Sequence, residues 1–405
     1  MIAKIGLIGI NGFGEAHVET TLSLIEKGRV QCIAFADVNV DMEDEYFKRL
    51  IRSGAQYYEN YEDMLDNQKD MDFVAIATPI ALHKTMAIKA LNKGFNVLLE
   101  KPPAVTIQEI DEIIAASKKN GKLCAVDFQN TSGTAFKMLI SKIQEKAIGE
   151  IQKVIGVGMW KRTKSYYERT PWAGKLIHNG QYVLDGTLNN PLAHLLNNCL
   201  LVAGKGDAIA AVPEWVHAEL YKGHDIQGED TTCVKVHAKN GVDIMYYTTL
   251  CNPTQDIPYI KVYGNCGEAI WDYSNTLDII YTDGQKDHYS YGEESLMENM
   301  YLNLIDAIED RNVKLNSSID DCRSFVIASN GAFESCGRPV KIPNEYLDIQ
   351  PEDNTIATSI KNVNKIFENA IAEGKLFSEL SVEWAVKTDP FIMKDYTCFE
   401  LFKLD

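Results

Sequence analysis

A glycine-rich turn, Gly9-Ile10-Asn11-Gly12-Phe13-Gly14, follows the first apolar segment of the chain. Glycines let backbone N–H groups approach a pyrophosphate at the start of a helix, which is the chemistry of a dinucleotide-binding turn. The usual motif has a glycine where Asn11 stands, but asparagine tolerates a positive φ better than most side chains. The predicted cofactor-binding residues of the turn are therefore Gly9, Asn11, Gly12, Phe13 and Gly14.

A carboxylate, Asp37, ends the second apolar segment. A carboxylate about twenty residues after a glycine turn accepts hydrogen bonds from the adenosine ribose hydroxyls and repels a 2′-phosphate. The sequence therefore favours NAD over NADP as the cofactor. The alternative interpretation is that Asp37 only caps a loop.

Further polar groups follow two later apolar segments. Thr78 and Pro79 follow the first of these, with His83 opening the next helix, and Glu100 and Lys101 precede a pair of prolines after the second. In a doubly wound sheet, the carboxyl ends of the strands face the ligand crevice. We therefore expect these residues at the cofactor, with Lys101 near the nicotinamide.

The pattern of the first 128 residues must position these groups. Apolar segments alternate there with helical periods, which indicates a parallel sheet covered on both faces. The expected strands are Lys4–Ile10, Gln31–Ala36, Phe73–Ala77, Asn96–Leu99 and Leu123–Val126, and the expected helices lie near 15–27, 42–52, 82–93 and 106–119.

After Gly149 many strands follow one another with turn signals between them, which indicates a largely antiparallel sheet. The expected strands are Ile151–Trp160, Trp215–Leu220, Thr231–Ala238, Val242–Thr249, Tyr259–Tyr263, Glu268–Asp272 and Leu277–Tyr281, and the expected helices are 188–203, 294–309 and 319–335. The fold class is therefore α/β plus α+β. We expect an N-terminal Rossmann domain with a doubly wound parallel sheet (1–128), a C-terminal domain with a large, mostly antiparallel open sheet and flanking helices (129–345), and a C-terminal helical extension (346–405) with one helix at Thr355–Glu373.

The helix expected at 188–203 has an unusual polar face. Leucines form one side of it, and Asn190, His194 and Asn197 fall on the other. No Lys, Arg, Asp or Glu occurs from Thr187 through Ala203, although solvent-exposed helix faces are rarely free of charge. An uncharged Asn/His face suits hydrogen bonding to a neutral polyol, and a structural histidine is the alternative.

Aromatic and basic side chains gather between residues 160 and 175. Aromatic rings stack on the apolar faces of sugars, while Arg, Lys and Tyr can bind sugar hydroxyls. The candidate substrate-binding residues are Arg162, Tyr167, Arg169, Trp172 and Lys175, together with Asn197 of the helix. Packing of a domain junction or a subunit contact is the alternative.

The chain resembles the glucose–fructose oxidoreductase / inositol dehydrogenase (Gfo/Idh/MocA) family over roughly residues 3 to 343. The features that carry the resemblance are the glycine turn ending in His17, Thr78-Pro79 with His83, Glu100-Lys101-Pro102, the later helix with His194, and Glu334-Ser335-Cys336-Gly337-Arg338-Pro339. Glu-Lys-Pro after the fifth strand is the most specific of them.

The resemblance implies that Lys101 lies in the active site and that the His194 helix carries an Asp-x-x-x-His motif. Asn190 stands at the aspartate position, and Asp185 just before the helix is a candidate to supply the missing carboxylate. The catalytic candidates are therefore Lys101, His194, Asp185 and Asn190. The implied activity is NAD-dependent hydride transfer to or from a secondary hydroxyl of a sugar, sugar derivative or cyclitol.

Two alternatives stay open. Some members of the family keep their cofactor bound and oxidise transiently, so that the net reaction is glycoside cleavage or elimination through a keto-sugar. The other alternative is a non-catalytic NAD-binding scaffold or sensor.

Composition limits the partners. The net charge of −17 argues against nucleic acid and anionic membranes, and no segment approaches the roughly 18 apolar residues that span a bilayer. Nine scattered cysteines without a Cys-x-x-Cys pair favour reduced thiols in the cytoplasm over disulfides or a metal site. A homodimer or homotetramer is expected because open sheets of this kind commonly pair face to face.

Overall fold

The computed structural model describes residues 2–206 and 209–402. The chain forms two compact units, of which the first comprises Met1–Ala104, Gln108–Ser132 and Ser295–Cys322. The second comprises Val105–Ile107, Gly133–Glu294 and Arg323–Asp405. Among the described residues, no helix combines the length and the apolar character that crossing a membrane requires.

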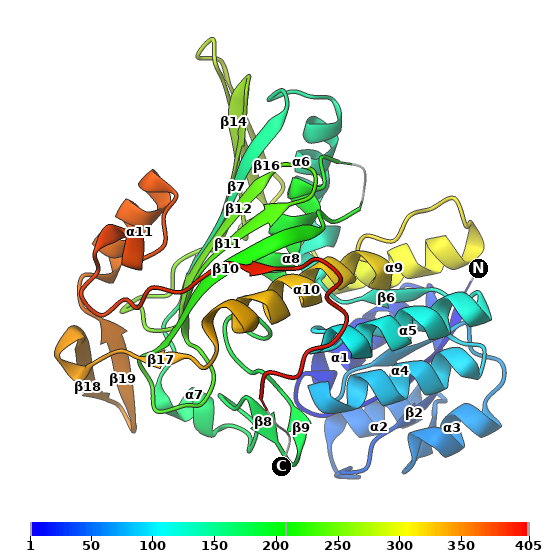
Figure 1. Ribbon diagram of the computed structural model, residues 1–405. Helices are drawn as coiled ribbons and strands as arrows, with labels where there is room; N and C mark the ends of the chain where they lie inside the picture. Colours follow the sequence, from blue (N-terminus) through cyan, green and yellow to red (C-terminus); the bar gives the residue numbers. More distant parts are fainter. Residues whose placement is uncertain (1, 207–208, 403–405) are drawn as a thin grey trace. The chain divides into compact units, whose positions relative to one another are not determined.

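The first unit contains a parallel sheet of six strands in the order β3-β2-β1-β4-β5-β6 (Figure 1). Its strands are β1 Ala3–Ile8, β2 Val30–Ala36, β3 Gln56–Tyr58, β4 Phe73–Ile76, β5 Asn96–Leu99 and β6 Cys124–Val126. Its helices are α1 Gly14–Glu26, α2 Glu45–Arg52, α3 Tyr61–Asn67, α4 His83–Asn92, α5 Ile107–Asn120 and α9 Leu296–Glu309, with short 3₁₀ turns at Ile80–Leu82 and Gln129–Ser132. This strand order is that of a Rossmann fold and confirms the prediction.

Helix α9 follows the large sheet in the sequence but packs in the first unit. Tyr301, Leu304 and Ile305 join the same core cluster as Ile5 and Phe73 of the parallel sheet. The sequence predicts this helix as amphipathic but does not indicate which core it completes.

The second unit contains a mostly antiparallel sheet in the order β16-β15-β14-β13-β7-β12-β11-β10-β17, with β20 also paired to β10. Its strands are β7 Ile151–Met159, β10 Pro213–Lys222, β11 Thr231–Ala238, β12 Asp243–Thr249, β13 Tyr259–Gly264, β14 Gly267–Asp272, β15 Thr276–Tyr281, β16 Lys286–Ser290, β17 Val340–Lys341 and β20 Phe391–Ile392. Two small hairpins are β8 Ile177–His178 with β9 Gln181–Tyr182, and β18 Leu347–Glu352 with β19 Thr355–Ile360. The remaining helices are α6 Thr134–Gln144, α7 Lys164–Glu168, α8 Ala193–Ala203, α10 Ile319–Cys336 and α11 Val363–Glu373, with 3₁₀ turns at Asn344–Tyr346 and Ser378–Leu380. The predicted large, mostly antiparallel sheet is confirmed.

Helix α8 packs against the large sheet, mainly on β7. A Cβ added to Gly156 of β7 would come within 2.5 Å of the Cys199 Sγ of α8, so the close packing requires glycine. The predicted start of this helix at residue 188 is wrong, because α8 begins at Ala193 and residues 188–192 form turns. Pro191 explains the late start, since a proline disfavours the helical conformation of the residue before it.

The prediction of one helix over Thr355–Glu373 is also wrong. The first part, Thr355–Ile360, is strand β19 and pairs with β18, and only Val363–Glu373 is helical. The sequence TIATSI is rich in β-branched residues, which favour a strand.

The C-terminal residues cover part of one face of the large sheet. Phe367, Phe377 and Trp384 pack in one cluster with Tyr221 and Tyr247 of the sheet. The ring centroids of Tyr221 and Trp384 are 4.8 Å apart. This part of the sheet is therefore buried by the chain itself and is not open for pairing with a second copy.

Candidate active site

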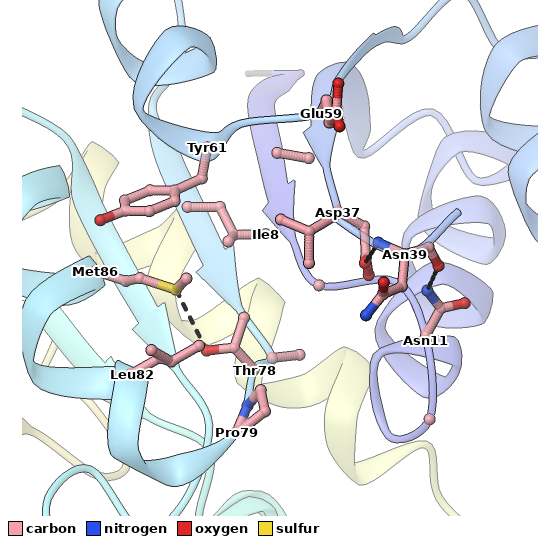
Figure 2. A pocket seen from close by; sticks show the side chains of 15 residues that line it. Ile8, Asn11, Asp37, Asn39, Glu59, Tyr61, Thr78, Pro79, Leu82 and Met86 are labelled. Atoms are coloured by element: carbon pink, nitrogen blue, oxygen red, sulfur yellow. Dashed lines mark hydrogen bonds between the residues drawn. The ribbon is translucent and has the colours of Figure 1, made fainter. Parts of the chain in front are cut away.

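A cavity of about 350 Å³ lies in the first unit at the carboxyl ends of β1, β2 and β4 (Figure 2). The predicted cofactor residues that line it are Gly9, Asn11, Gly12, Asp37, Thr78 and Pro79. Nine lining residues were not predicted: Ile8, Ala36, Val38, Asn39, Glu59, Tyr61, Ala77, Leu82 and Met86. The predicted cofactor residues that do not line this cavity are Phe13, Gly14, His83, Glu100 and Lys101. Tyr61 and Glu59 follow the short strand β3, whose three residues gave too weak a pattern to be recognised.

The glycine turn forms one wall of this cavity and needs its glycines. Gly9 has a φ of +88°, and a Cβ there would come within 2.2 Å of the Ala77 carbonyl oxygen. Gly12 has a φ of +61°. The expectation that Asn11 uses its tolerance for a positive φ is wrong, because Gly12 takes that conformation instead. The Asn11 side-chain amide donates to the Asn39 carbonyl oxygen at 2.6 Å, so it braces the turn against the loop after β2.

Asp37 is held at the edge of the cavity by backbone donors. Its Oδ2 accepts from the Ile10 N–H at 2.9 Å, and its Oδ1 accepts from the Asn39 N–H at 3.0 Å. Each carboxylate oxygen keeps a lone pair for a further donor. Glu59 lines the same cavity, so two acidic residues border it, and both would repel a 2′-phosphate.

Replacing Asp37 by asparagine should weaken NADH binding about tenfold or more, because a hydrogen bond to a charged group contributes about 1.5–3 kcal/mol. The variant should also lose part of its preference for NADH over NADPH. Both effects can be measured by equilibrium titration of protein fluorescence with each nucleotide. Glu26→Gln, at an exposed position of α1, is the matched control, and unchanged NADH affinity in Asp37→Asn would contradict the role assigned to Asp37.

A buried polar network lies directly before Lys101 in the first unit. The His17 Nδ1 is 2.8 Å from the Tyr301 hydroxyl, and its Nε2 is 3.0 Å from the Glu100 Oε1. An Asp127 carboxylate oxygen lies 3.8 Å from the same Nε2. The Glu100 Oε2 accepts from the Lys101 backbone N–H at 2.9 Å, so the network holds the backbone from which the Lys101 side chain starts.

Burial changes the protonation of this network. It raises the pKa of the Glu100 carboxyl to about 7 and the pKa of the Asp127 carboxyl well above its usual range, and the adjacent carboxyl raises the Asp127 pKa further. Ionising two neighbouring buried carboxyls costs free energy, because their like charges repel each other in a poorly solvated site. The pair therefore keeps a proton near neutral pH. Asp127 and Tyr301 were not predicted, because nothing in the sequence brings them next to His17.

His83 links two loops of the first unit. Its Nδ1 is 2.8 Å from the Pro102 carbonyl oxygen, and its Nε2 is 2.8 Å from the Thr78 carbonyl oxygen. The imidazole therefore fixes the loop after β4 to the loop after β5. His83 is buried, and its predicted contact with the cofactor stays a prediction.

In the second unit, a carboxylate lies beside Asn190. The Asn190 amide donates to the Asp185 Oδ1 at 2.8 Å, and the Gly174 N–H donates to the Asp185 Oδ2 at 2.6 Å. This is the arrangement expected if Asp185 supplies the carboxylate that Asn190 lacks. His194 is half-buried in the first turn of α8. The catalytic roles of these residues stay predictions.

The polar side of α8 is buried. Asn197 is 1% exposed, and within the described residues its side-chain amide has no hydrogen-bond partner. The neighbouring Asn198 amide is in the same state. A buried amide without partners costs free energy, so these groups are suited to binding water or a ligand.

The aromatic segment forms a cluster of ring contacts in the second unit. The guanidinium groups of Arg162 and Arg169 lie over the Tyr166 ring, and burial raises the pKa of Tyr166 to about 12. Tyr166 was not among the predicted residues. The Tyr167 ring contacts the His224 ring, with centroids 4.8 Å apart. The remaining two predicted residues, Trp172 and Lys175, are half-buried.

A family model described as the oxidoreductase family with an NAD-binding Rossmann fold matches residues 3–128. Over these residues the chain is similar to the Gfo/Idh/MocA family. The predicted resemblance is thereby confirmed, and the first unit is a Rossmann domain of the NAD-binding type.

Curated relatives of this chain include inositol 2-dehydrogenase of Salmonella typhimurium, which is 28% identical over 157 residues, 38% of this chain and 46% of the relative. A glycosyl hydrolase family 109 protein of Shewanella pealeana is 28% identical over 155 residues, 36% of this chain and 33% of the relative. The chain thus matches between a third and a half of the length of these relatives.

Solved structures share the fold over most of the chain. Levoglucosan dehydrogenase in complex with NADH superposes with a TM-score of 0.70 at 17% identity, covering 82% of this chain and 96% of that one. UDP-N-acetylglucosamine 3-dehydrogenase from Acidithiobacillus ferrooxidans superposes with a TM-score of 0.66 at 15% identity, covering 82% and 97%.

Proposed function

We propose that this protein is an NAD-dependent oxidoreductase that transfers a hydride between the nicotinamide and a secondary hydroxyl of a sugar, sugar derivative or cyclitol. The observation that carries the proposal is the cavity of the first unit, with the Gly9–Gly12 turn on one side and Asp37 at its edge. The similar proteins named inositol 2-dehydrogenase and levoglucosan dehydrogenase support the substrate class.

The residues of the cavity fit NAD. Backbone N–H groups of the glycine turn suit the pyrophosphate, and the Asp37 carboxylate suits the ribose hydroxyls. The side chains of Leu82 and Met86 supply an apolar surface for the adenine. NAD bound there would supply the hydride acceptor for oxidation of an alcohol.

The chain's own part in the reaction is to handle the hydroxyl proton. We assign Lys101 to polarising the alcohol oxygen or taking its proton, since it follows β5 directly and its backbone is held by Glu100. His194 is the second candidate proton acceptor. Asp185, in contact with Asn190, is the candidate carboxylate for stabilising a charged imidazole.

The second candidate function is redox-neutral glycoside cleavage through a transient keto-sugar, with NAD retained. It is favoured by the similarity to a glycosyl hydrolase family 109 protein. A C–H bond next to a temporary ketone is acidic, which makes elimination of the glycosidic group accessible. A non-catalytic NAD-binding protein would instead bind NAD and turn over no polyol.

The first experiment is to purify the protein without added cofactor, record its absorbance and fluorescence, and identify any nucleotide released on denaturation. For an ordinary dehydrogenase we expect an empty protein that binds NADH more tightly than NADPH and forms NADH from NAD⁺ with a free sugar or cyclitol. Retained NAD(H), with glycoside cleavage and no accumulating NADH, would instead establish the redox-neutral reaction. Binding of neither nucleotide would contradict both.

A further inference from the structure

The segment from Trp160 to Lys175 has a net positive charge, whereas the whole chain has a net negative charge. It carries five basic residues and one acidic residue, whereas the whole chain has 40 basic and 57 acidic residues. Two of its lysines are neutralised, because Lys161 pairs with Glu352 and Lys164 pairs with Glu168. The remaining positive charge lies on two arginines and on the last lysine of the segment.

The two arginines have only neutral contacts among the described residues. The Arg162 Nη1 donates to the Gln255 Oε1 at 2.9 Å and to the Lys161 carbonyl oxygen at 2.8 Å. The Arg169 Nη1 donates to the Tyr166 carbonyl oxygen. Both guanidinium groups lie over the Tyr166 ring, with Cζ atoms 5.2 Å and 3.7 Å from its centroid. No carboxylate of the described chain lies within ion-pair distance of either group.

Arg162 is fixed at its backbone by buried groups. Its N–H donates to the Leu250 carbonyl oxygen at 3.0 Å, and its carbonyl oxygen is 3.1 Å from the His224 Nε2. His224 is held in turn by Asp230, whose carboxylate lies 2.9 Å from the His224 Nδ1. The guanidinium is thus attached to a rigid support, which lowers the entropy lost on binding a ligand.

The C-terminal hairpin β18–β19 supports the same segment from another direction. The Ser165 N–H donates to the Thr355 hydroxyl at 3.0 Å, Thr163 forms a β-bridge with Ala357, and Glu352 pairs with Lys161. Part of the C-terminal extension therefore orders the arginine-bearing segment.

We propose that Arg162 and Arg169 bind an anionic group, a carboxylate or a phosphate, on the substrate. The inference rests on the proposed function, since it specifies the chemical class of the sugar or cyclitol. A guanidinium offers a planar pair of donors that matches both anions, and its charge is uncompensated here. A purely neutral polyol, as the face of the His194 helix suggests, would leave both charges without a counter-ion.

The test is equilibrium binding by calorimetry in the presence of NADH. The probes are glucose, galactose and mannose, each as the neutral sugar, the uronic acid and the 6-phosphate. We expect at least one charged probe to bind about 10- to 100-fold more tightly than its neutral parent, the range of a charge-assisted hydrogen bond. The uronic acids and the phosphates distinguish the two sources of the anion. This affinity should also fall as salt is added.

Arg162→Gln and Arg169→Gln should each remove most of this difference between the charged probe and its neutral parent while leaving binding of NADH nearly unchanged. Lys164→Gln is the matched control, because Lys164 is exposed in the same segment but paired with Glu168. If no charged probe binds more tightly than its neutral parent, or if the arginine variants keep the difference, the proposal is overturned. Formation of NADH from neutral sugars would in that case still support the proposed function, so the two failures are distinguishable.

Discussion

Replacing Lys101 by alanine should lower kcat about 10²- to 10⁴-fold, the range that a positioned acid–base group contributes. The variant loses the Lys101 side chain but keeps the backbone N–H that donates to the Glu100 carboxylate. The loop after β5 therefore keeps this hydrogen bond. The NADH dissociation constant should change little, because Lys101 does not line the cavity that holds Gly9 and Asp37. Steady-state kinetics with an identified substrate and a fluorescence titration with NADH check the two statements separately.

Lys119→Ala is the matched control for this variant, since Lys119 is an exposed lysine on α5 of the same unit. It should leave both kcat and the NADH dissociation constant unchanged. A Lys101 variant with near-normal kcat would refute the assignment of Lys101 to the chemical step. A variant that loses kcat and NADH affinity together would instead place Lys101 in cofactor binding.

The sequence predicts those parts of the fold that depend on local patterns. The β1, β2, β4, β5 and β6 strands of the first unit are continuous apolar runs, and each one was located to within about two residues, as is usual for boundaries. The strand β19 was mistaken for a helix because its apolar residues fit either period over so short a segment. In the structure this segment is a strand because it pairs with β18.

The residues of the candidate site also fall into two groups, those predicted from local sequence motifs and those that depend on packing between distant segments. Gly9, Asn11 and Asp37 were predicted because their meaning lies in a short motif and a fixed spacing. Asp127 and Tyr301 were missed because their importance depends on being buried next to His17, from which they are separated by more than a hundred residues. Only the packing of β6 and α9 into the first unit brings these three side chains together.

A second large effect is expected for Glu229, a buried carboxyl group of the second unit. It is fully buried, and its Oε1 accepts from the Leu188 N–H at 3.0 Å. A Cβ on Gly186 would lie within 2.2 Å of the Glu229 carboxyl, so this carboxyl packs directly under the turn that carries Asp185. Its Oε2 has no hydrogen-bond partner among the described residues. Burial, with a smaller contribution from the Asp185 and Asp230 carboxylates, raises the pKa of Glu229 to about 8, although the hydrogen bond from the Leu188 N–H lowers it.

This raised pKa makes the stability of the second unit depend on pH. The folded state holds the proton to about pH 8, whereas the unfolded chain releases it near the ordinary value of 4.5. The contribution to stability is therefore complete below about pH 4.5 and is lost as pH rises toward 8. Each unit between the two pKa values corresponds to about 1.4 kcal/mol, so the full loss amounts to about 5 kcal/mol.

Glu229→Gln should remove this pH dependence, because a glutamine keeps an acceptor for the Leu188 N–H and cannot ionise. Relative to the wild type, its free energy of unfolding should rise by about 1.4 kcal/mol per pH unit between pH 5 and pH 8. Urea unfolding followed by tryptophan fluorescence reports on the second unit, because all five tryptophans (Trp160, Trp172, Trp215, Trp271 and Trp384) lie in it.

Glu293→Gln is the control for the loss of a carboxylate as such, since Glu293 is exposed in the same unit. Its unfolding curve should run parallel to that of the wild type at every pH. Parallel curves for Glu229→Gln as well would show that Glu229 is ionised in the folded protein and that water or a cation reaches its Oε2. If the wild type loses free energy of unfolding more steeply with pH and Glu229→Gln abolishes this loss, the carboxyl packed against the turn that carries Asp185 is neutral. In that case ionisation of Glu229 at high pH would place a second negative charge beside the candidate catalytic carboxylate.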